Sequence, residues 1–160
     1  MARQKTSDED GIKVVSHNKR AFHEYDILDR IECGLVLVGT EVKSLREGHA
    51  SLEDAFARID GGEVWLIGCD IPEYTYGNRL NHKPKRPRKL LLHRREIGKF
   101  AGKASQRGFT LVPLRMYFKN GRAKVELAVA RGKQLHDKRQ AAKKADAQKE
   151  IRRAMSDRRR

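Results

Sequence analysis

Alternating apolar and polar residues in the first third of the chain predict strands. Residues 22–31 carry apolar side chains on alternate positions, and residues 35–38 form a short continuous apolar run. Both patterns are typical of strands in a sheet with one buried face. Thr40 can then cap a short helix over residues 41–47, because its hydroxyl can accept a hydrogen bond from the first turn. The chain is therefore predicted to begin with a strand, a strand and a helix.

A first hairpin is predicted around two consecutive glycines. Residues 55–60 alternate between small or apolar and polar side chains, and residues 64–67 continue as an apolar strand. Gly61 and Gly62 between them can form a two-residue turn, since glycine adopts the positive φ angles that such turns require.

A second hairpin is predicted around Asn120 and Gly121, which also suit positive φ angles. The turn joins residues 109–118 to residues 123–130, and the second of these runs alternates cleanly. Its side chains expected to point inward are Val125, Leu127 and Val129. In the first run the inward parity changes across Pro113, which predicts a β-bulge.

An amphipathic helix is predicted between the two hairpins. At about 100° per residue, the apolar side chains of residues 94–107 gather on one arc. About six strands, two or three short helices and no alternation of strands with long helices indicate a mainly β, OB-type antiparallel barrel. A split α+β sandwich is the alternative architecture.

The barrel is predicted to occupy residues 12–130, with a flexible N-terminus over residues 1–11. From residue 131 the strand pattern stops, and the remainder is rich in charge, alanine and glutamine. Such a segment cannot bury enough apolar surface to offset its ordering entropy. We expect residues 131–160 to form a basic tail that is disordered when free and helical when bound.

The charge of the chain points to a polyanionic partner. It contains 36 Lys and Arg against 21 Asp and Glu, a net charge of +15, which attracts phosphate. No run of about 18 apolar residues could span a membrane, so a soluble cytoplasmic protein, monomeric when free, is expected. Cys33 and Cys69 lie in apolar contexts without a C-x-x-C motif, which predicts two buried thiols and no metal or other cofactor.

One cluster of cations lies in a loop that also carries aromatic side chains. Residues 74–89 contain Tyr74, Tyr76 and His82, and the cations there are Lys83, Lys85, Arg86, Arg88 and Lys89. Cations can contact phosphates while aromatic rings stack on unpaired bases, so this mixture suits RNA. The alternative is a solvated loop with both tyrosines packed inward.

Two further basic clusters follow. The predicted helix carries a cation at every fourth position: Arg95, Lys99, Lys103 and Arg107. Like charges at this spacing repel each other, and a bound anion would relieve the repulsion. The alternative is that they form an ordinary solvent-exposed face of the helix. Residues 131–160 contain twelve Lys and Arg against four Asp and Glu. This tail could lie along phosphates, or it could serve only as a solubilising extension.

The sequence offers no catalytic constellation. His23 stands beside Glu24, and His136 beside Asp137, but adjacent residues of a strand or helix point in different directions. Neither doublet therefore forms an acid–base pair by spacing alone. The chain also lacks the phosphate-binding loop and the H-E-x-x-H motif, so we do not expect an enzyme.

Four stretches of the chain have the character of family motifs: NKRAFHEY at residues 18–25, GTEVKSLREG at 39–48, RKLLLHRREI at 88–97 and GKQLHDKR at 132–139. Together they resemble the SmpB family, the tmRNA-binding proteins of bacterial trans-translation. The resemblance implies an OB-type barrel that binds the tRNA-like domain of tmRNA and accompanies it to ribosomes stalled without a codon. It also implies that the tail probes the empty mRNA channel beyond the decoding centre. A small basic ribosomal or initiation-factor-like OB protein is the alternative.

The same resemblance implies which residues act. Glu32, Leu91 and His93 match the family's RNA-contact surface: a carboxylate can accept hydrogen bonds from base edges or a 2′-hydroxyl, while Leu91 and His93 can pack or stack on a base. Otherwise Leu91 could belong to the core and Glu32 could be an ordinary surface charge. The other RNA-binding candidates are Arg20, His23, Lys85, Arg86, Arg88 and Lys89. The tail motif implied to act on the ribosome is Gly132, His136, Asp137, Lys138 and Arg139.

Overall fold

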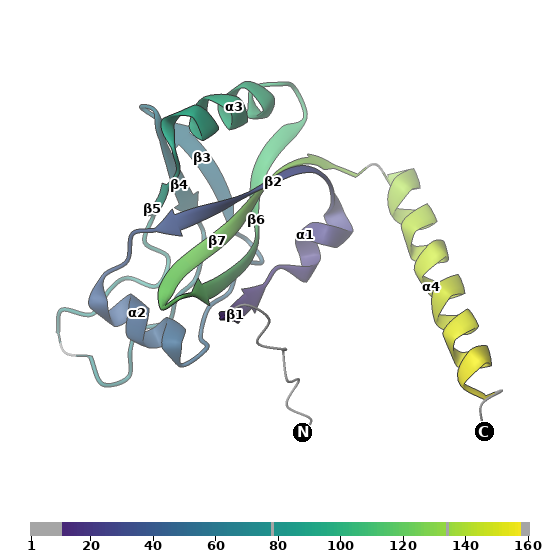
Figure 1. Ribbon diagram of the computed structural model, residues 1–160, viewed down its shortest axis with the longest axis horizontal. Coiled ribbons are helices and arrows are strands. Elements are labelled where there is room, and N and C mark those ends of the chain that lie inside the picture. Colours follow the sequence, from purple (N-terminus) through teal and green to yellow (C-terminus); the bar gives the residue numbers. More distant parts are fainter. Residues whose placement is uncertain (1–10, 78, 134, 158–160) are drawn as a thin grey trace.

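One antiparallel sheet organises the chain, whose computed structural model describes residues 11–77, 79–133 and 135–157 (Figure 1). Its strands are β1 (Ile12–His17), β2 (Tyr25–Leu35), β3 (Phe56–Asp60), β4 (Glu63–Ile67), β5 (Arg88–Leu91), β6 (Phe109–Lys119) and β7 (Arg122–Gly132). The helices are α1 (Lys19–Glu24), α2 (Gly39–Arg46), α3 (Arg94–Ala104) and α4 (Leu135–Asp157). Within the described ranges, no helix is long and apolar enough to cross a membrane.

The sheet closes on itself. Its strand order is β1-β6-β3-β4-β5-β2-β7, and an additional pairing joins β6 to β7. All strands from β2 to β7 therefore lie in one ring, and β1 pairs with residues 115–119 of β6. The prediction of a mainly β, antiparallel architecture is confirmed, with seven strands in the described residues instead of about six. In Figure 1, α3 lies across one end of the ring and α2 lies near the other.

The core fills the ring as the alternation of β7 predicted. Val125, Leu127 and Val129 are almost completely buried in the main apolar cluster. The intervening small side chains, Ala128 and Ala130, are also buried, because they face a second cluster that α1 covers with Ala21. Both faces of β7 are thus shielded from water over this stretch.

The bulge predicted at Pro113 is present. The register of β6 against β7 shifts between Pro113 and Arg115, so Leu114 has no residue opposite it. Asn18 fills the disrupted ladder: its backbone N–H donates to the carbonyl of Leu114 at 2.7 Å, and its side-chain amide donates to the carbonyl of Pro113 at 2.9 Å. Asn18 Oδ1 also accepts from the N–H of Ala21, which caps α1. One buried side chain therefore holds α1 against the bulge.

The strand predicted over residues 22–31 is wrong at its start. Residues 22–24 belong to α1, which Asn18 initiates, and the strand begins only at Tyr25. It then runs without a break to Leu35, so residues 36–38 are not a separate strand. Val36 and Val38 are exposed, which is why their apolar character was misleading.

Two strands were not predicted. β1 mixes apolar residues with Lys13, Ser16 and His17, because it pairs only with β6 and leaves its other edge unpaired among the described strands. β5 has four residues and begins inside the basic run at Arg88. Neither segment has the long alternation of apolar and polar residues by which strands are recognised in a sequence.

Both predicted short helices are present with shifted ends. α2 begins at Gly39, and the carboxylate of Glu41 accepts a hydrogen bond from the N–H of Val38 at 3.0 Å. Thr40 does not cap the helix, because its hydroxyl bonds Nδ1 of His82. α3 ends at Ala104, so Arg107 lies outside it.

The tail begins two residues later than predicted, because β7 continues to Gly132. The N–H of Lys133 donates to the carbonyl of Glu24 at 2.9 Å, which fixes the root of the tail at the end of α1. From there α4 extends away from the sheet (Figure 1), and most of its described side chains are exposed. The disordered free state of the tail stays a prediction.

Candidate nucleic-acid interface

Glu32, Leu91 and His93 meet around one surface hollow. They come from β2, from the end of β5 and from the residue preceding α3, and the hollow has a volume of about 480 Å³. Its other lining residues are Ile31, Gly34, Leu92, Glu96 and Lys124. The pairing of Gly34 with Leu91 joins β2 to β5 and brings these segments together. Three positions singled out by sequence are therefore neighbours in space.

Leu91 points outward from β5. Leu90 is 2% exposed inside the ring, whereas Leu91 is 51% exposed beside Glu32. The backbone of Gly34 allows this arrangement, because a Cβ atom there would lie 3.1 Å from Cβ of Leu91. Core packing, the alternative role for Leu91, is thus taken by Leu90, and an apolar surface is left for a ligand.

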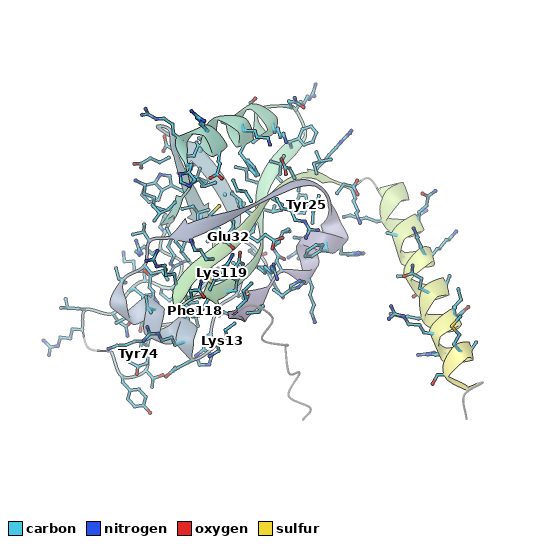
Figure 2. All side chains as sticks on the ribbon, viewed as in Figure 1. Lys13, Tyr25, Glu32, Tyr74, Phe118 and Lys119 are labelled. Atoms are coloured by element: carbon cyan, nitrogen blue, oxygen red, sulfur yellow. The ribbon has the colours of Figure 1, made fainter. Side chains whose placement is uncertain are left out.

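The carboxylate of Glu32 is held by β6. Oε2 accepts a hydrogen bond of 2.5 Å from the hydroxyl of Tyr117 and one of 3.5 Å from Nζ of Lys119. Glu32 and Lys119 lie next to each other in Figure 2. The hydrogen bond from Tyr117 and the charge of Lys119 lower the pKa of Glu32, against the opposing effect of burial. Glu32 is therefore an ionised hydrogen-bond acceptor at neutral pH.

His93 occupies the N-terminus of α3. Its backbone N–H donates to Oε2 of Glu96 at 3.0 Å, and its carbonyl accepts from the N–H of Ile97 at 3.0 Å. The backbone is thus fixed by the helix while the side chain is exposed. An exposed imidazole in this position can stack on a base or donate a hydrogen bond.

Arg88 is not part of the RNA-accessible surface. Its side chain is fully buried and forms an ion pair with Glu41, while its guanidinium also donates to the carbonyls of Cys69 at 2.7 Å and Pro84 at 2.9 Å. A guanidinium used in this way has no surface left for a phosphate. We therefore assign Arg88 to the interior support of the loop rather than to RNA contact.

Glu41 is the acceptor that keeps this arrangement buried. Nη2 of Arg86 donates to Oε1 of Glu41 at 2.5 Å, in addition to the bond from Arg88. Burial by itself would raise the pKa of Glu41, but the hydrogen bonds from Val38, Arg86 and Arg88 outweigh it and lower the pKa. Arg86 is only partly exposed for the same reason.

The loop still presents cations and one aromatic ring. Lys85 is exposed, and Lys89 is partly exposed beside Glu63, to which its Nζ donates at 2.7 Å. Tyr76 is 82% exposed, whereas Tyr74 packs against it edge-on at 5.7 Å. Tyr74 is itself only partly buried, so the expected alternative in which both tyrosines pack inward is not found.

His82 is not available for stacking on a base. It is buried, its Nε2 donates to the carbonyl of Ile71 at 2.7 Å, and its Nδ1 accepts from the hydroxyl of Thr40 at 2.8 Å. The protonated nitrogen follows from the carbonyl, which can only accept. His82 thus holds the loop to α2.

The basic ridge predicted on α3 is only partly free. Nζ of Lys103 donates to Oδ2 of Asp29 at 2.5 Å, and this hydrogen bond lowers the pKa of Asp29. Arg107 lies beyond the helix, so Arg95 and Lys99 are the members of the ridge that remain exposed on α3.

Near α1 the structure shows a stacked aromatic pair that the sequence analysis missed. The rings of His17 and Phe22 are parallel at 5.3 Å, and the guanidinium of Arg30 lies 5.5 Å from the centre of the Phe22 ring. Of the two α1 candidates, His23 is exposed, and Arg20 is paired with Glu24 at 2.9 Å and with Asp54 at 3.2 Å. The feature of the sequence that could have indicated this aromatic pair is Phe22, an apolar residue in an otherwise polar segment.

The tail motif starts in β7 and continues into α4. Gly132 is the last residue of β7, and Arg139 is exposed on α4 while Lys138 is partly buried. The side chains of His136 and Asp137 lie outside what the structure describes.

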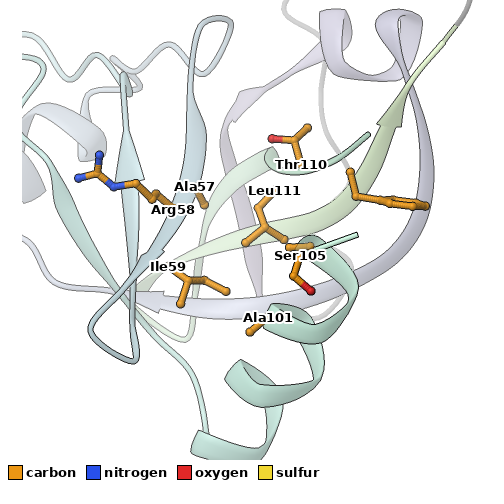
Figure 3. A pocket seen from close by; sticks show the side chains of 9 residues that line it. Ala57, Arg58, Ile59, Ala101, Ser105, Thr110 and Leu111 are labelled. Atoms are coloured by element: carbon orange, nitrogen blue, oxygen red, sulfur yellow. The ribbon is translucent and has the colours of Figure 1, made fainter. Parts of the chain in front are cut away.

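A second hollow lies between β3, β6 and the end of α3 (Figure 3). It has a volume of about 320 Å³, and its lining is mostly small or apolar, including Ala57, Ala101 and Leu111. None of the residues implied to contact RNA lines it. Across the described ranges, no group of three or more His, Cys, Asp or Glu residues could hold a metal ion.

The chain is similar to a known family of proteins over most of its length. The model of the family described as SmpB protein matches residues 15–157. An SsrA-binding protein of Thermobifida fusca is 57% identical over 99% of this chain and 100% of the relative. One from Corynebacterium urealyticum is 60% identical over 88% of this chain and 79% of the relative. A solved structure described as "tmRNA-SmpB: a journey to the center of the bacterial ribosome" is 48% identical, with a TM-score of 0.65 over 75% of this chain and 85% of that chain.

Proposed function

The chain belongs to the SmpB protein family, and from this premise we propose that it is an adaptor that binds the tRNA-like domain of tmRNA and brings it to stalled ribosomes. Its relatives carry the name SsrA-binding protein, and the similar solved structure is of tmRNA with SmpB in the ribosome. The family match extends over both the ring of strands and α4. It favours this adaptor over a ribosomal or initiation-factor-like protein.

The observation that carries the proposal is the hollow formed by Glu32, Leu91 and His93. It combines an ionised acceptor, an exposed apolar side chain and an exposed imidazole within one site. These groups suit an unstacked nucleotide, whose edge offers donors and whose face needs an apolar surface. Phosphates elsewhere on the bound RNA would be neutralised by exposed cations such as Lys85 and Lys99.

The tail is proposed to have a separate role on the ribosome. Residues 131–160 hold twelve Lys and Arg against four Asp and Glu, and the described part of α4 is largely exposed. We assign to it the probing of the empty mRNA channel, with His136, Lys138 and Arg139 near the decoding centre. In this proposal the protein acts by binding RNA and the ribosome, without catalysis, in the cytoplasm where ribosomes act.

A gel-shift series tests the first role. The full chain is titrated against the tRNA-like domain of tmRNA and against an unrelated RNA hairpin of equal length, over a range of salt concentrations. The tRNA-like domain should bind more tightly at every salt concentration, and log K should fall with log salt by roughly 0.7 to 0.9 per neutralised phosphate. Equal affinity for the two RNAs would overturn the proposal.

A truncation tests the division of roles. The chain is ended after Lys133, because β7 reaches Gly132 and Lys133 is bonded to Glu24. We expect tmRNA binding to be retained within about threefold, since only distant phosphate contacts would be lost, and tagging of stalled nascent chains to be abolished. Loss of tmRNA binding in this variant would show that the tail belongs to the tmRNA site.

A further inference from the structure

We propose that Tyr117 is a positioning residue for RNA binding, which acts by orienting the carboxylate of Glu32; this inference rests on the proposed function. Tyr117 lies on β6 and is not among the residues that line the hollow. It would contribute to binding through Glu32, without touching the RNA.

The geometry places one tyrosine hydroxyl against one carboxylate oxygen. Tyr117 is 2% exposed, and its hydroxyl donates to Oε2 of Glu32 at 2.5 Å. The two residues belong to strands that both pair with β7, where Glu32 lies opposite Glu126 and Tyr117 lies opposite Lys124. The phenol therefore reaches across β7 to a side chain 85 residues earlier in the sequence.

The aromatic ring of Tyr117 is itself held in place by Arg115. The guanidinium of Arg115 lies 5.0 Å from the ring centre, and Nε of Arg115 donates to Oε2 of Glu126 at 2.6 Å. Oε1 of Glu126 accepts a second hydrogen bond, of 3.3 Å, from Arg30. This chain of contacts leaves the ring little freedom, so the position of its hydroxyl is determined before any ligand arrives.

These contacts use only one of the two carboxylate oxygens of Glu32. Among the described residues, Oε2 takes the bonds from Tyr117 and Lys119, and no hydrogen bond involves Oε1. Oε1 is therefore available to a base amino group or a 2′-hydroxyl. A carboxylate that is already oriented loses less conformational entropy when the ligand binds.

Two lysines also attract the carboxylate of Glu32. Lys119 on β6 and Lys124 on β7 are cations near it, while Glu96 of α3 and His93 line the same hollow. Without the hydroxyl of Tyr117, the side chain of Glu32 would follow the lysines and adopt several rotamers. Burial together with the bond to Glu32 raises the pKa of Tyr117, so the phenol stays protonated and remains a donor over the working pH range.

The test compares Y117F with the matched control Y25F. Phenylalanine keeps the ring at position 117 and removes only the donor, whereas Tyr25 is a partly buried tyrosine that does not line the hollow. Affinity is measured by fluorescence anisotropy with the tRNA-like domain of tmRNA. A hydrogen bond to a charged group corresponds to roughly a tenfold change, so Y117F should weaken binding about tenfold and Y25F less than twofold.

Two readouts separate positioning from a structural effect. In the double variant Y117F/E32Q the loss should not exceed that of E32Q alone, because Tyr117 acts only through Glu32. The pKa of Glu32, followed by carboxylate NMR in the free protein, should rise in Y117F, because the bond from Tyr117 is the largest contribution that lowers it. A second variant, R115Q, removes the cation beside the aromatic ring of Tyr117 but keeps the tyrosine hydroxyl. It should weaken RNA binding less than Y117F does, and only when Glu32 is present.

The outcomes distinguish this inference from the proposed function. Wild-type affinity in Y117F, or a loss that adds to that of E32Q, would overturn the role of Tyr117 while tmRNA binding stands. A wild-type chain that binds the tRNA-like domain no better than an unrelated hairpin would overturn the proposed function itself. An unchanged pKa of Glu32 in Y117F would exclude orientation as the mechanism.

Discussion

Glu41 and Arg88 form an ion pair in which neither side chain has any exposed surface. Glu41 lies in α2 and Arg88 begins β5, 47 residues later in the sequence. The pair therefore fixes the start of the strand that carries Leu91 to the hollow. Nη1 and Nη2 of Arg88 each donate to a backbone carbonyl, so every nitrogen of the buried guanidinium has a hydrogen-bond partner.

Substitution Glu41→Gln should lower the free energy of unfolding by about 3–5 kcal/mol, because it leaves Arg88 charged and uncompensated in the interior. The matched control is Glu63→Gln, which breaks the exposed pair with Lys89 and should cost less than about 1 kcal/mol. Urea denaturation of both variants measures the difference. Similar losses in the two variants would contradict the structural role of the buried pair.

Acid should destabilise the protein through carboxylates whose pKa is lowered in the folded state. The pKa of Asp29 is lowered first by the bond from Lys103, that of Glu32 first by the bond from Tyr117, and that of Glu41 by bonds that outweigh its burial. Such groups contribute stability that is fully present above their unfolded pKa, about 4, and lost as pH falls through the folded pKa. Stability should therefore decline from about pH 5 downward.

The measurement is urea denaturation at pH 7, 5 and 3 for the wild type and Glu41→Gln. The variant should lose less stability than the wild type over this interval, since one of the responsible carboxylates is absent. A wild-type free energy of unfolding that stays constant to pH 3 would contradict the prediction.

Neighbouring leucines of β5 should respond in opposite ways. Leu90→Ala should cost about 2–5 kcal/mol of stability, because it opens a cavity inside the ring. Leu91→Ala, on the exposed side, should change stability by less than about 1 kcal/mol but weaken binding of the tRNA-like domain by roughly tenfold, if one base stacks there. Thermal unfolding and anisotropy on both variants test this; a binding loss in Leu91→Ala that matches its loss of folded protein would refute it.

Cys33 and Cys69 should react slowly while the protein is folded. Both thiols are fully buried, and desolvation by burial raises the pKa of each to about 12. Only the thiolate is the reactive form. Labelling with Ellman's reagent at pH 8 should therefore be slow in buffer and rapid in urea. Rapid labelling of either thiol in buffer would mean that the ring of strands opens locally.

Local signals in the sequence were sufficient for the second half of the ring. Asn120 and Gly121 both adopt positive φ angles in the turn between β6 and β7, as their residue types predicted. The parity change at Pro113 identified the bulge. These features depend on residues that are adjacent in the chain, so short patterns are enough to specify them.

The sequence by itself thus determined the two hairpins, the bulge, the buried thiols and the excess of positive charge. Only the tertiary structure decided which side chains of the basic loop face water. Arg88 and Lys85 look alike in the sequence, but Arg88 meets Glu41 from a distant helix and is buried, while Lys85 stays exposed. Burial of a charge requires a partner, and that partner is supplied by the fold, not by neighbouring residues. For the same reason, only the packed strands show that Tyr117 holds Glu32.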